Sequence, residues 1–184
     1  MTIAVMQRQN PHRFAPAAPD ESFVFGACAP GWHTAAGHER AVDDWLDYVA
    51  ARDIERVCCL MPGRQLDTTG LNVARYQSAF GESKVCHAPI PNHHLATPEQ
   101  LNGEILPFLA NARDAEERTV VHCLAGIGRT GQVLAGWLVY NRDYGPKKAT
   151  ETVREMGRDP SDAIEAGNAD PADLTALLAS VARR

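Results

Sequence analysis

Apolar and polar residues follow one another along this chain in segments of two kinds. Four short segments are apolar almost throughout and end near turn residues, which is typical of buried β-strands; they are SFVFGA (22–27), ERVCCLM (55–61), KVCHAPI (84–90) and RTVVHC (118–123). Other segments repeat their apolar residues every three or four positions, as one face of an α-helix does. The clearest example spans residues 38–51, where Val42, Trp45, Leu46 and Val49 share one predicted helix face.

Helices are predicted between and after these strands. Thr97, followed by Pro98 and Gln100, carries the signature of a helix start, and we expect this helix to run towards residue 114 with a kink at Pro107. Further helices are expected near residues 71–80, 130–143, 146–157 and 171–182. Strands that alternate with helices predict an α/β fold with a central, mostly parallel sheet flanked by helices.

A chain of 184 residues is long enough for one domain with a substantial core. Residues 1–20 are rich in proline, alanine and polar residues, and we expect them to form an N-terminal tail or surface arm. Neither a repeat nor a linker interrupts residues 21–184, which we expect to form a single domain.

The composition excludes several classes of partner. The net charge of -5 gives no electrostatic reason to expect a nucleic acid or an anionic membrane. No apolar run is long enough to span a bilayer and the N-terminal sequence lacks the features of a signal peptide, so we expect a cytoplasmic protein. The five cysteines are odd in number and lie mostly in apolar segments, which favours free thiols over a disulfide framework.

The candidate chemistry is concentrated in HCLAGIGRTG, residues 122–131. Cys123 ends the last predicted strand, and a loop with two glycines leads from it to Arg129 and a helix. The N–H groups of such a loop can surround an anion, and the planar fork of an arginine matches phosphate oxygens. The same positive field favours ionisation of a thiol, so we expect the sulfur of Cys123 to be a thiolate that attacks phosphorus. Thr130 can donate its hydroxyl to that sulfur, and we expect His122 to brace the loop through hydrogen bonds.

This segment resembles the signature loop of the cysteine-based protein tyrosine phosphatases, H-C-x-x-G-x-x-R-S/T-G. The order of predicted elements over residues 22–180 also resembles that of a compact, dual-specificity-type phosphatase. The resemblance implies a two-step hydrolysis of phosphomonoesters with no metal and no cofactor. By match of motif, Cys123 would be the nucleophile and Arg129 the phosphate clamp. The substrate-binding cradle would consist of Leu124, Ala125, Gly126, Ile127 and Gly128.

One position departs from the family pattern. In similar phosphatases the loop after the third strand reads I-P-D, and its aspartate protonates the leaving oxygen; here the matching residue is Asn92, whose amide has no transferable proton. Three explanations stay open. Another group supplies the proton, with His93 and His94 nearest and Asp67 or Glu99 more distant. Alternatively the enzyme is slow or confined to good leaving groups, or the residue was changed to trap substrate.

The side chains of the signature loop indicate the substrate class. Phosphatases of inositol phosphates that resemble this family carry basic residues inside the loop, whereas Leu124, Ala125 and Ile127 are uncharged. We therefore expect a phosphorylated protein as the partner, with phosphotyrosine first and phosphoserine or phosphothreonine second. Two alternatives remain: a phosphate-binding module that hydrolyses poorly because of Asn92, and a phosphatase of phosphoinositides or another non-protein phosphate ester.

Overall fold

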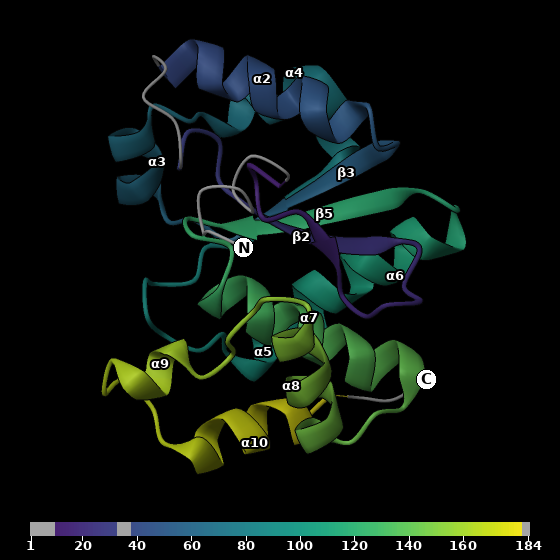
Figure 1. The fold of residues 1–184 in the computed structure, drawn as a ribbon, viewed down its shortest axis with the longest axis vertical. Coiled ribbons are helices and arrows are strands. Elements are labelled where there is room, and N and C mark those ends of the chain that lie inside the picture. Colours follow the sequence, from purple (N-terminus) through teal and green to yellow (C-terminus); the bar gives the residue numbers. More distant parts are fainter. Residues whose placement is uncertain (1–9, 33–37, 182–184) are drawn as a thin grey trace.

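The computed structural model describes residues 10–32 and 38–181 (Figure 1). Its centre is a five-stranded sheet whose strands are β1 (Ala15–Pro16), β2 (Val24–Cys28), β3 (Ile54–Cys59), β4 (Val85–His87) and β5 (Arg118–Cys123). The strand order is β1-β2-β5-β3-β4. β1 pairs antiparallel with β2 and the other pairs are parallel, so the predicted α/β fold with a mostly parallel sheet is confirmed.

Helices cover both faces of this sheet. They are α2 (His38–Ala50), α3 (Gly63–Thr69), α4 (Val73–Phe80), α5 (Pro98–Gln100), α6 (Leu106–Asp114), α7 (Gly128–Arg142), α8 (Pro146–Glu155), α9 (Asp162–Glu165) and α10 (Pro171–Ala179), with a 3₁₀ turn at Glu82–Lys84 and a π-helical turn at Leu101–Ile105. Figure 1 shows α2 and α4 on one face of the sheet and α6 and α7 on the other. α8 and α10 pack against α7 and against each other on its outer side.

Two buried cores fix the helices to the sheet. Trp45 of α2 and Tyr76 of α4 are fully buried on one face, and Leu134 and Trp137 of α7 are fully buried on the other. β5 lies between these cores and is buried on both faces, which explains why its sequence is apolar nearly throughout. Because burial of one large apolar side chain contributes on the order of 1.5–3 kcal/mol, the cores hold β5 and α7 firmly in place.

The predicted strands and helices are present, with ends that differ by a few residues. β4 ends at His87 and is shorter than its prediction, although Ala88 and Ile90 beyond it still donate backbone hydrogen bonds to Cys59 and Leu60. The irregularity expected at Pro107 takes the form of the π-helical turn directly before α6, whose wider spacing relieves the clash of the proline ring with the preceding turn. The predicted end of the last helix, residue 182, lies outside the described residues.

Two helices were missed by sequence reasoning. α3 begins after Pro62, so the proline and glycine that follow the predicted strand 55–61 open a helix. α9 has four residues. Helices of one or two turns offer too few positions for a periodic pattern to be recognised.

The N-terminal segment predicted as a tail or surface arm is, from residue 10 onward, packed onto the domain. It contributes the edge strand β1, Phe14 stacks on Phe25 of β2 with ring centroids 5.0 Å apart, and the two alanines after β1 are fully buried. A two-residue strand shows no alternation of apolar and polar residues, so a proline-containing edge of this kind escapes a pattern search. Residues 1–9 of the predicted arm lie outside the described residues.

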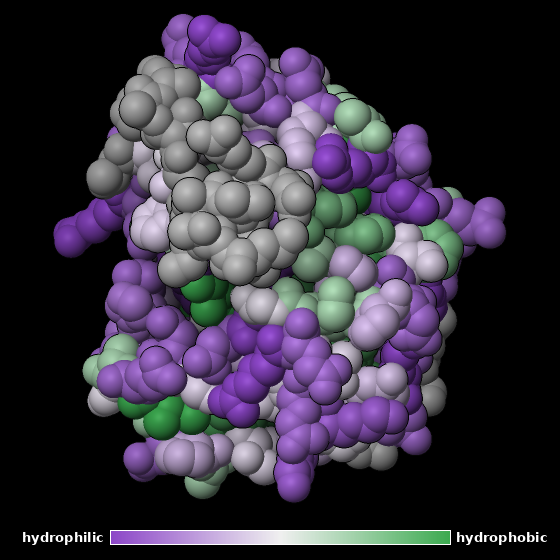
Figure 2. Space-filling view, in the orientation of Figure 1, coloured by the Kyte–Doolittle hydropathy of each residue, from purple (hydrophilic) through white to green (hydrophobic). Residues whose placement is uncertain are grey.

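The surface agrees with a domain whose apolar residues are turned inward. In Figure 2 the helices at the top of the view present mostly hydrophilic residues, and hydrophobic residues show near the level of the sheet and again in a strip towards the bottom of the view, near α9 and α10. In the part of the chain that the structure describes, no helix combines the length and the apolar character needed to cross a membrane.

Candidate active site

The loop of residues 124–127 connects the central strand β5 to α7. Cys123 is the last residue of β5, and Gly128 is the first residue of α7. The parallel strands β2 and β3 flank β5, and Cys28 at the end of β2 is level with Cys123. The loop thus lies at the carboxyl ends of the parallel strands, where ligands of open α/β sheets bind.

Four successive carbonyl groups of this loop are turned outward, because each accepts a hydrogen bond from the protein around it. The bonds run from Ala29 N–H to Leu124 O (2.9 Å), from Arg13 Nη1 to Ala125 O (3.2 Å), from Arg158 Nη1 to Gly126 O, and from Gly131 N–H to Ile127 O (2.9 Å). In a planar trans peptide the N–H points away from the carbonyl of the same unit. The N–H groups of residues 125–128 therefore face inward and form a cradle for an anion, to which the N-terminus of α7 adds partial positive charge.

Gly126 and Gly128 are required by the close approach of neighbouring atoms. Gly126 has a φ of +71°, and a Cβ there would lie 2.4 Å from the carbonyl oxygen of Ala27 in β2. At Gly128 a Cβ would lie 2.5 Å from the Cβ of Asp162 in α9. The cradle is consequently enclosed between β2 and α9.

Cys123 is 2% exposed at the start of the loop, and the Thr130 hydroxyl donates a hydrogen bond to its sulfur over 3.2 Å. This contact agrees with the expectation for Thr130. All five cysteines are free, as expected. Burial raises the pKa of Cys28 and of Cys59 to about 12, which keeps both as neutral thiols in neutral solution. Cys123 has a different setting, since its sulfur accepts a hydroxyl hydrogen bond beside the N-terminus of α7.

The guanidinium of Arg129 is buried and oriented by three neutral acceptors. Its Nη1 donates to Gln65 Oε1 (2.7 Å) and to the carbonyl of Ile90 (3.1 Å), and its Nη2 donates to Asn92 Oδ1 (3.0 Å). Gln65 belongs to α3, and the other two acceptors belong to the loop after β4. Because none of these acceptors carries charge, the positive charge of Arg129 stays available to a phosphate dianion.

His122 connects the nucleophile strand to α4. Its ring is fully buried, with Nε2 2.9 Å from the Tyr76 hydroxyl and Nδ1 3.1 Å from the carbonyl oxygen of Cys123. Burial lowers the pKa of His122 to about 4, so the imidazole is neutral at pH 7. In that state Nδ1–H donates to the carbonyl and Nε2 accepts the tyrosine hydroxyl. The geometry therefore agrees with the bracing role expected from the sequence.

Two guanidinium groups that the sequence analysis did not single out hold the loop from behind. Arg158, between α8 and α9, is 3% exposed and donates to Gly126 O and, through Nη2, to the carbonyls of Arg13 (2.6 Å) and Gly26 (2.7 Å). Its Nε is buried and makes no hydrogen bond. Burial lowers the pKa of Arg158 to about 10, which leaves it charged at pH 7. A lone arginine after a helix has no motif, and Arg13 lies in the segment interpreted as a tail, so tertiary structure was needed to find both.

The loop after β4 brings two of the candidate acid-loop residues to the cradle. Asn92 contacts Arg129, and Nδ1 of His93 lies 2.9 Å from Asp162 Oδ2. His94 is exposed, with its Nδ1 2.8 Å from the carbonyl oxygen of Asn92.

The more distant acid candidates make no contact with the signature loop among the described residues. Asp67 is exposed on α3 and Glu99 is exposed on α5. Among the contacts of the described residues, neither carboxylate reaches residues 122–130.

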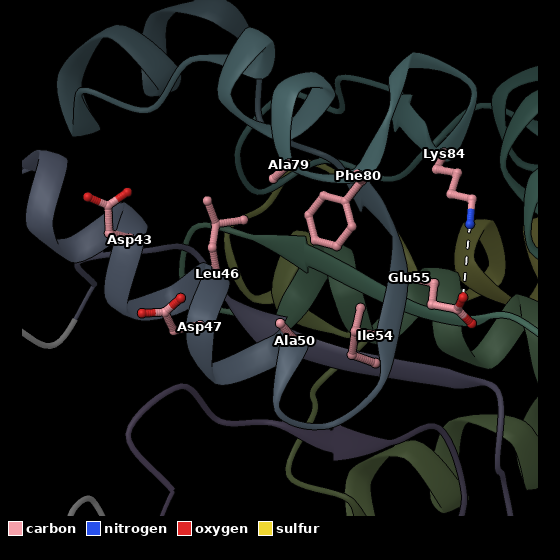
Figure 3. A pocket seen from close by; sticks show the side chains of 9 residues that line it. All are labelled: Asp43, Leu46, Asp47, Ala50, Ile54, Glu55, Ala79, Phe80 and Lys84. Carbon is pink, nitrogen blue, oxygen red and sulfur yellow. Dashed lines mark ion pairs between the residues drawn. The ribbon is translucent and has the colours of Figure 1, made fainter.

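A groove of about 760 Å³ lies at the opposite end of the sheet (Figure 3). Side chains of α2, α4 and the beginning of β3 line it. Figure 3 shows Leu46 of α2 and Phe80 of α4 facing each other, with Asp43 and Asp47 on the α2 side. The groove adjoins Ile54, the first residue of β3, whereas the signature loop follows the last residue of β5. It is therefore separate from the cradle.

The parallel sheet, the buried nucleophile candidate and the anion cradle define a cysteine-based phosphatase of the protein tyrosine phosphatase type. A family model described as "Tc-R-P: Polymorphic toxin system, DSP-PTPase phosphatase" matches residues 32–143, which is more than half of the chain. The protein belongs to this family of dual-specificity-type phosphatases. A comparison with curated proteins gives no match.

Solved structures agree with this fold. Tk-PTP in its active form is 25% identical with a TM-score of 0.65, over 88% of this chain and 97% of that one. PTPMT1 in complex with PI(5)P is 13% identical with a TM-score of 0.64, over 91% and 96% of the two chains. P. aeruginosa TpbA in complex with pTyr is 15% identical with a TM-score of 0.53, over 85% and 86%.

Proposed function

We propose that this protein hydrolyses phosphomonoesters through a phosphocysteine intermediate on Cys123, acting on phosphotyrosine in proteins first and on phosphoserine or phosphothreonine second. The observation that carries the proposal is the cradle: four carbonyl groups turned outward leave the N–H groups of residues 125–128 facing the space above the Cys123 sulfur. This arrangement suits a tetrahedral dianion placed in line with a sulfur nucleophile.

In the first step the Cys123 thiolate attacks phosphorus, and the bond from phosphorus to the leaving oxygen breaks. Negative charge then spreads over the three remaining phosphate oxygens, which the inward N–H groups and the Arg129 guanidinium bind. These donors are already oriented before substrate arrives, because Gln65, Ile90 and Asn92 hold the guanidinium. Little reorganisation is therefore needed during the reaction.

In the second step water attacks the phosphocysteine and the sulfur leaves. The Thr130 hydroxyl, 3.2 Å from the sulfur, stabilises the departing thiolate by its hydrogen bond. His122 remains neutral throughout and joins the end of β5 to α4 through its hydrogen bond with Tyr76.

The choice of substrate is supported by the side chains at the cradle. Leu124, Ala125 and Ile127 are half-buried and uncharged. A highly phosphorylated ring would therefore meet no cation in residues 124–129 other than Arg129, which binds the reacting phosphate. The fold itself admits both substrate classes, since TpbA holds pTyr and PTPMT1 holds PI(5)P.

Phosphate release from three substrates tests the proposal: a phosphotyrosine peptide, a phosphothreonine peptide of the same sequence, and a soluble phosphoinositide monophosphate. We expect the highest kcat/KM for the phosphotyrosine peptide, no turnover by Cys123→Ser, and a loss of about 10²–10³-fold in Arg129→Lys, which lacks the fork. A higher kcat/KM for the phosphoinositide would contradict the substrate assignment. Full activity in Cys123→Ser would contradict the mechanism.

Asn92 favours a second candidate function, a module that binds phosphoproteins and hydrolyses them poorly. Its amide occupies the position from which an aspartate donates a proton in similar phosphatases, and here it serves as an acceptor for Arg129. Calorimetric titration with the phosphotyrosine peptide separates the two functions. Saturable binding without phosphate release would support the binding module, and rapid turnover would exclude it.

A further inference from the structure

His93 and Asp162 form a side-chain pair at the edge of the cradle. Nδ1 of His93 lies 2.9 Å from Oδ2 of Asp162, and the two side chains are 50% and 34% exposed. Asp162 is the first residue of α9 and lies against Gly128, where a Cβ would be 2.6 Å from the same Oδ2. The pair therefore joins the loop after β4 to the point at which α7 begins.

The backbone holds His93 at this edge. Its φ of +57° is in the left-handed region, which residues other than glycine adopt sparsely and mainly where the surroundings impose it. Its carbonyl accepts a hydrogen bond from Asn168 Nδ2 over 2.9 Å, and the preceding residue, Asn92, is bonded to Arg129. Contacts with the segment after α9 and, through Asn92, with the signature loop thus fix the backbone at His93, and the contact with Asp162 orients its imidazole.

We propose that His93, oriented by Asp162, is the group that protonates the leaving oxygen. The inference rests on the proposed function and supplies the acid that Asn92 cannot provide. With Nδ1–H directed at the Asp162 carboxylate, Nε2–H of the imidazolium is the donor that remains. The pair of imidazolium and carboxylate has no net charge, so the carboxylate beside the cradle does not repel the phosphate as it would on its own.

The proton balance closes over the two steps. In the first, the P–O bond breaks, the electron pair stays on the leaving oxygen, and that oxygen takes the proton from Nε2 of His93. The imidazole is then neutral and keeps Nδ1–H on Asp162. In the second step Nε2 takes a proton from the attacking water as the P–O bond forms and the S–P bond breaks, which regenerates the imidazolium and the thiolate.

The other candidates fit this role less well. His94 directs its Nδ1 to the carbonyl of Asn92, its own neighbour, and has no carboxylate partner among the described contacts. Asp67 and Glu99 are exposed on α3 and α5. His93 combines a position at the cradle with a carboxylate that fixes its tautomer, which is the usual arrangement of a catalytic histidine.

The dependence of kcat/KM on leaving-group acidity tests the proposal, with aryl phosphates from dinitrophenyl phosphate to phenyl phosphate as substrates. We expect a shallow dependence for the wild type. In His93→Gln we expect kcat/KM with phenyl phosphate to fall about 10²–10⁴-fold further than kcat/KM with dinitrophenyl phosphate, whose leaving group needs no proton. Asp162→Asn should give an intermediate slope, since it positions the imidazole and does not itself transfer the proton. His94→Gln, the matched control, should keep the wild-type slope.

Inhibition by orthovanadate, a phosphate mimic, checks that the cradle is intact. We expect it to change by less than about twofold in His94→Gln. In His93→Gln the Asp162 carboxylate loses its partner, so inhibition should weaken but stay measurable, and the slope rather than the rate tests the acid. A wild-type slope in His93→Gln would overturn the role of His93. A steep slope in the wild type would also overturn it, because it would mean that no acid protonates the leaving group. Both results leave the phosphatase proposal standing. That proposal fails separately if the wild type hydrolyses none of the aryl phosphates.

Discussion

The stability of the folded protein between pH 7 and pH 5 tests whether His122 is buried as a neutral imidazole. In the folded protein its ring is fully buried between the Tyr76 hydroxyl and the carbonyl of Cys123, and Trp45 packs on it with ring centroids 5.4 Å apart. Burial lowers the pKa of His122 from the ordinary 6.5 to about 4. In the unfolded chain the ring takes up its proton near pH 6.5, whereas in the folded chain it stays neutral until about pH 4.

The sign and size of the effect follow from this difference. Between pH 6.5 and 4 the unfolded state binds more protons than the folded state, so the free energy of unfolding falls as the pH falls. Well inside this window, each pH unit lowers the free energy of unfolding by at most about 1.4 kcal/mol. Between pH 7 and pH 5 the total loss is about 2 kcal/mol. The loss ends below the folded-state pKa, where both states are protonated.

Urea unfolding at pH 7, 6 and 5 measures this loss in the wild type and in His122→Asn, and we expect the variant to lack about 2 kcal/mol of the pH dependence. Tyr76→Phe is the matched control. It leaves the ring buried and should therefore keep the pH dependence, while the lost partner of Nε2 lowers stability at pH 7 by about 1–3 kcal/mol. A His122 imidazole that titrates above pH 6 by NMR in the folded protein would refute this reasoning.

Three further changes probe the cradle. Arg158→Lys keeps the charge but cannot reach three carbonyls, so the midpoint of thermal unfolding should fall. Inhibition by orthovanadate should weaken by about tenfold or more. Unchanged inhibition would show that Arg158 does not support the cradle. Gly126→Ala forces a Cβ to 2.4 Å from the Ala27 carbonyl at a φ of +71°, and should cost more than about 1 kcal/mol in urea unfolding. Its control, Gly103→Ala, places a Cβ in open space and should cost less. Thr130→Ala should slow breakdown of the phosphocysteine and give a stopped-flow burst of leaving group before the steady state, whereas Thr130→Ser keeps the hydroxyl and should show wild-type kinetics.

The four parallel strands and the signature loop could be predicted because local sequence determines them. RTVVHC is apolar nearly throughout, as a strand buried on both faces must be, and β5 has the predicted ends. Gly126 and Gly128 stand where the backbone of Ala27 and the side chain of Asp162 leave no room for a Cβ, so the motif itself records the loop geometry.

What escaped prediction depends on contacts between residues that are distant in the sequence. Arg158 reaches Gly126 across 32 positions, and Arg13 reaches Ala125 across 112, with no pattern that marks either arginine beforehand. The partner of His93 was hidden for the same reason, because Asp162 lies 69 positions away in a four-residue helix.

The central claim is that Cys123 carries the phosphate during turnover. Rapid acid quenching of the wild type during hydrolysis of an aryl phosphate, followed by mass spectrometry of the peptides, tests it most directly. We expect phosphate on the peptide that contains Cys123, and none on that peptide in Cys123→Ser. Phosphate found on another residue, or steady turnover by Cys123→Ser, would contradict it.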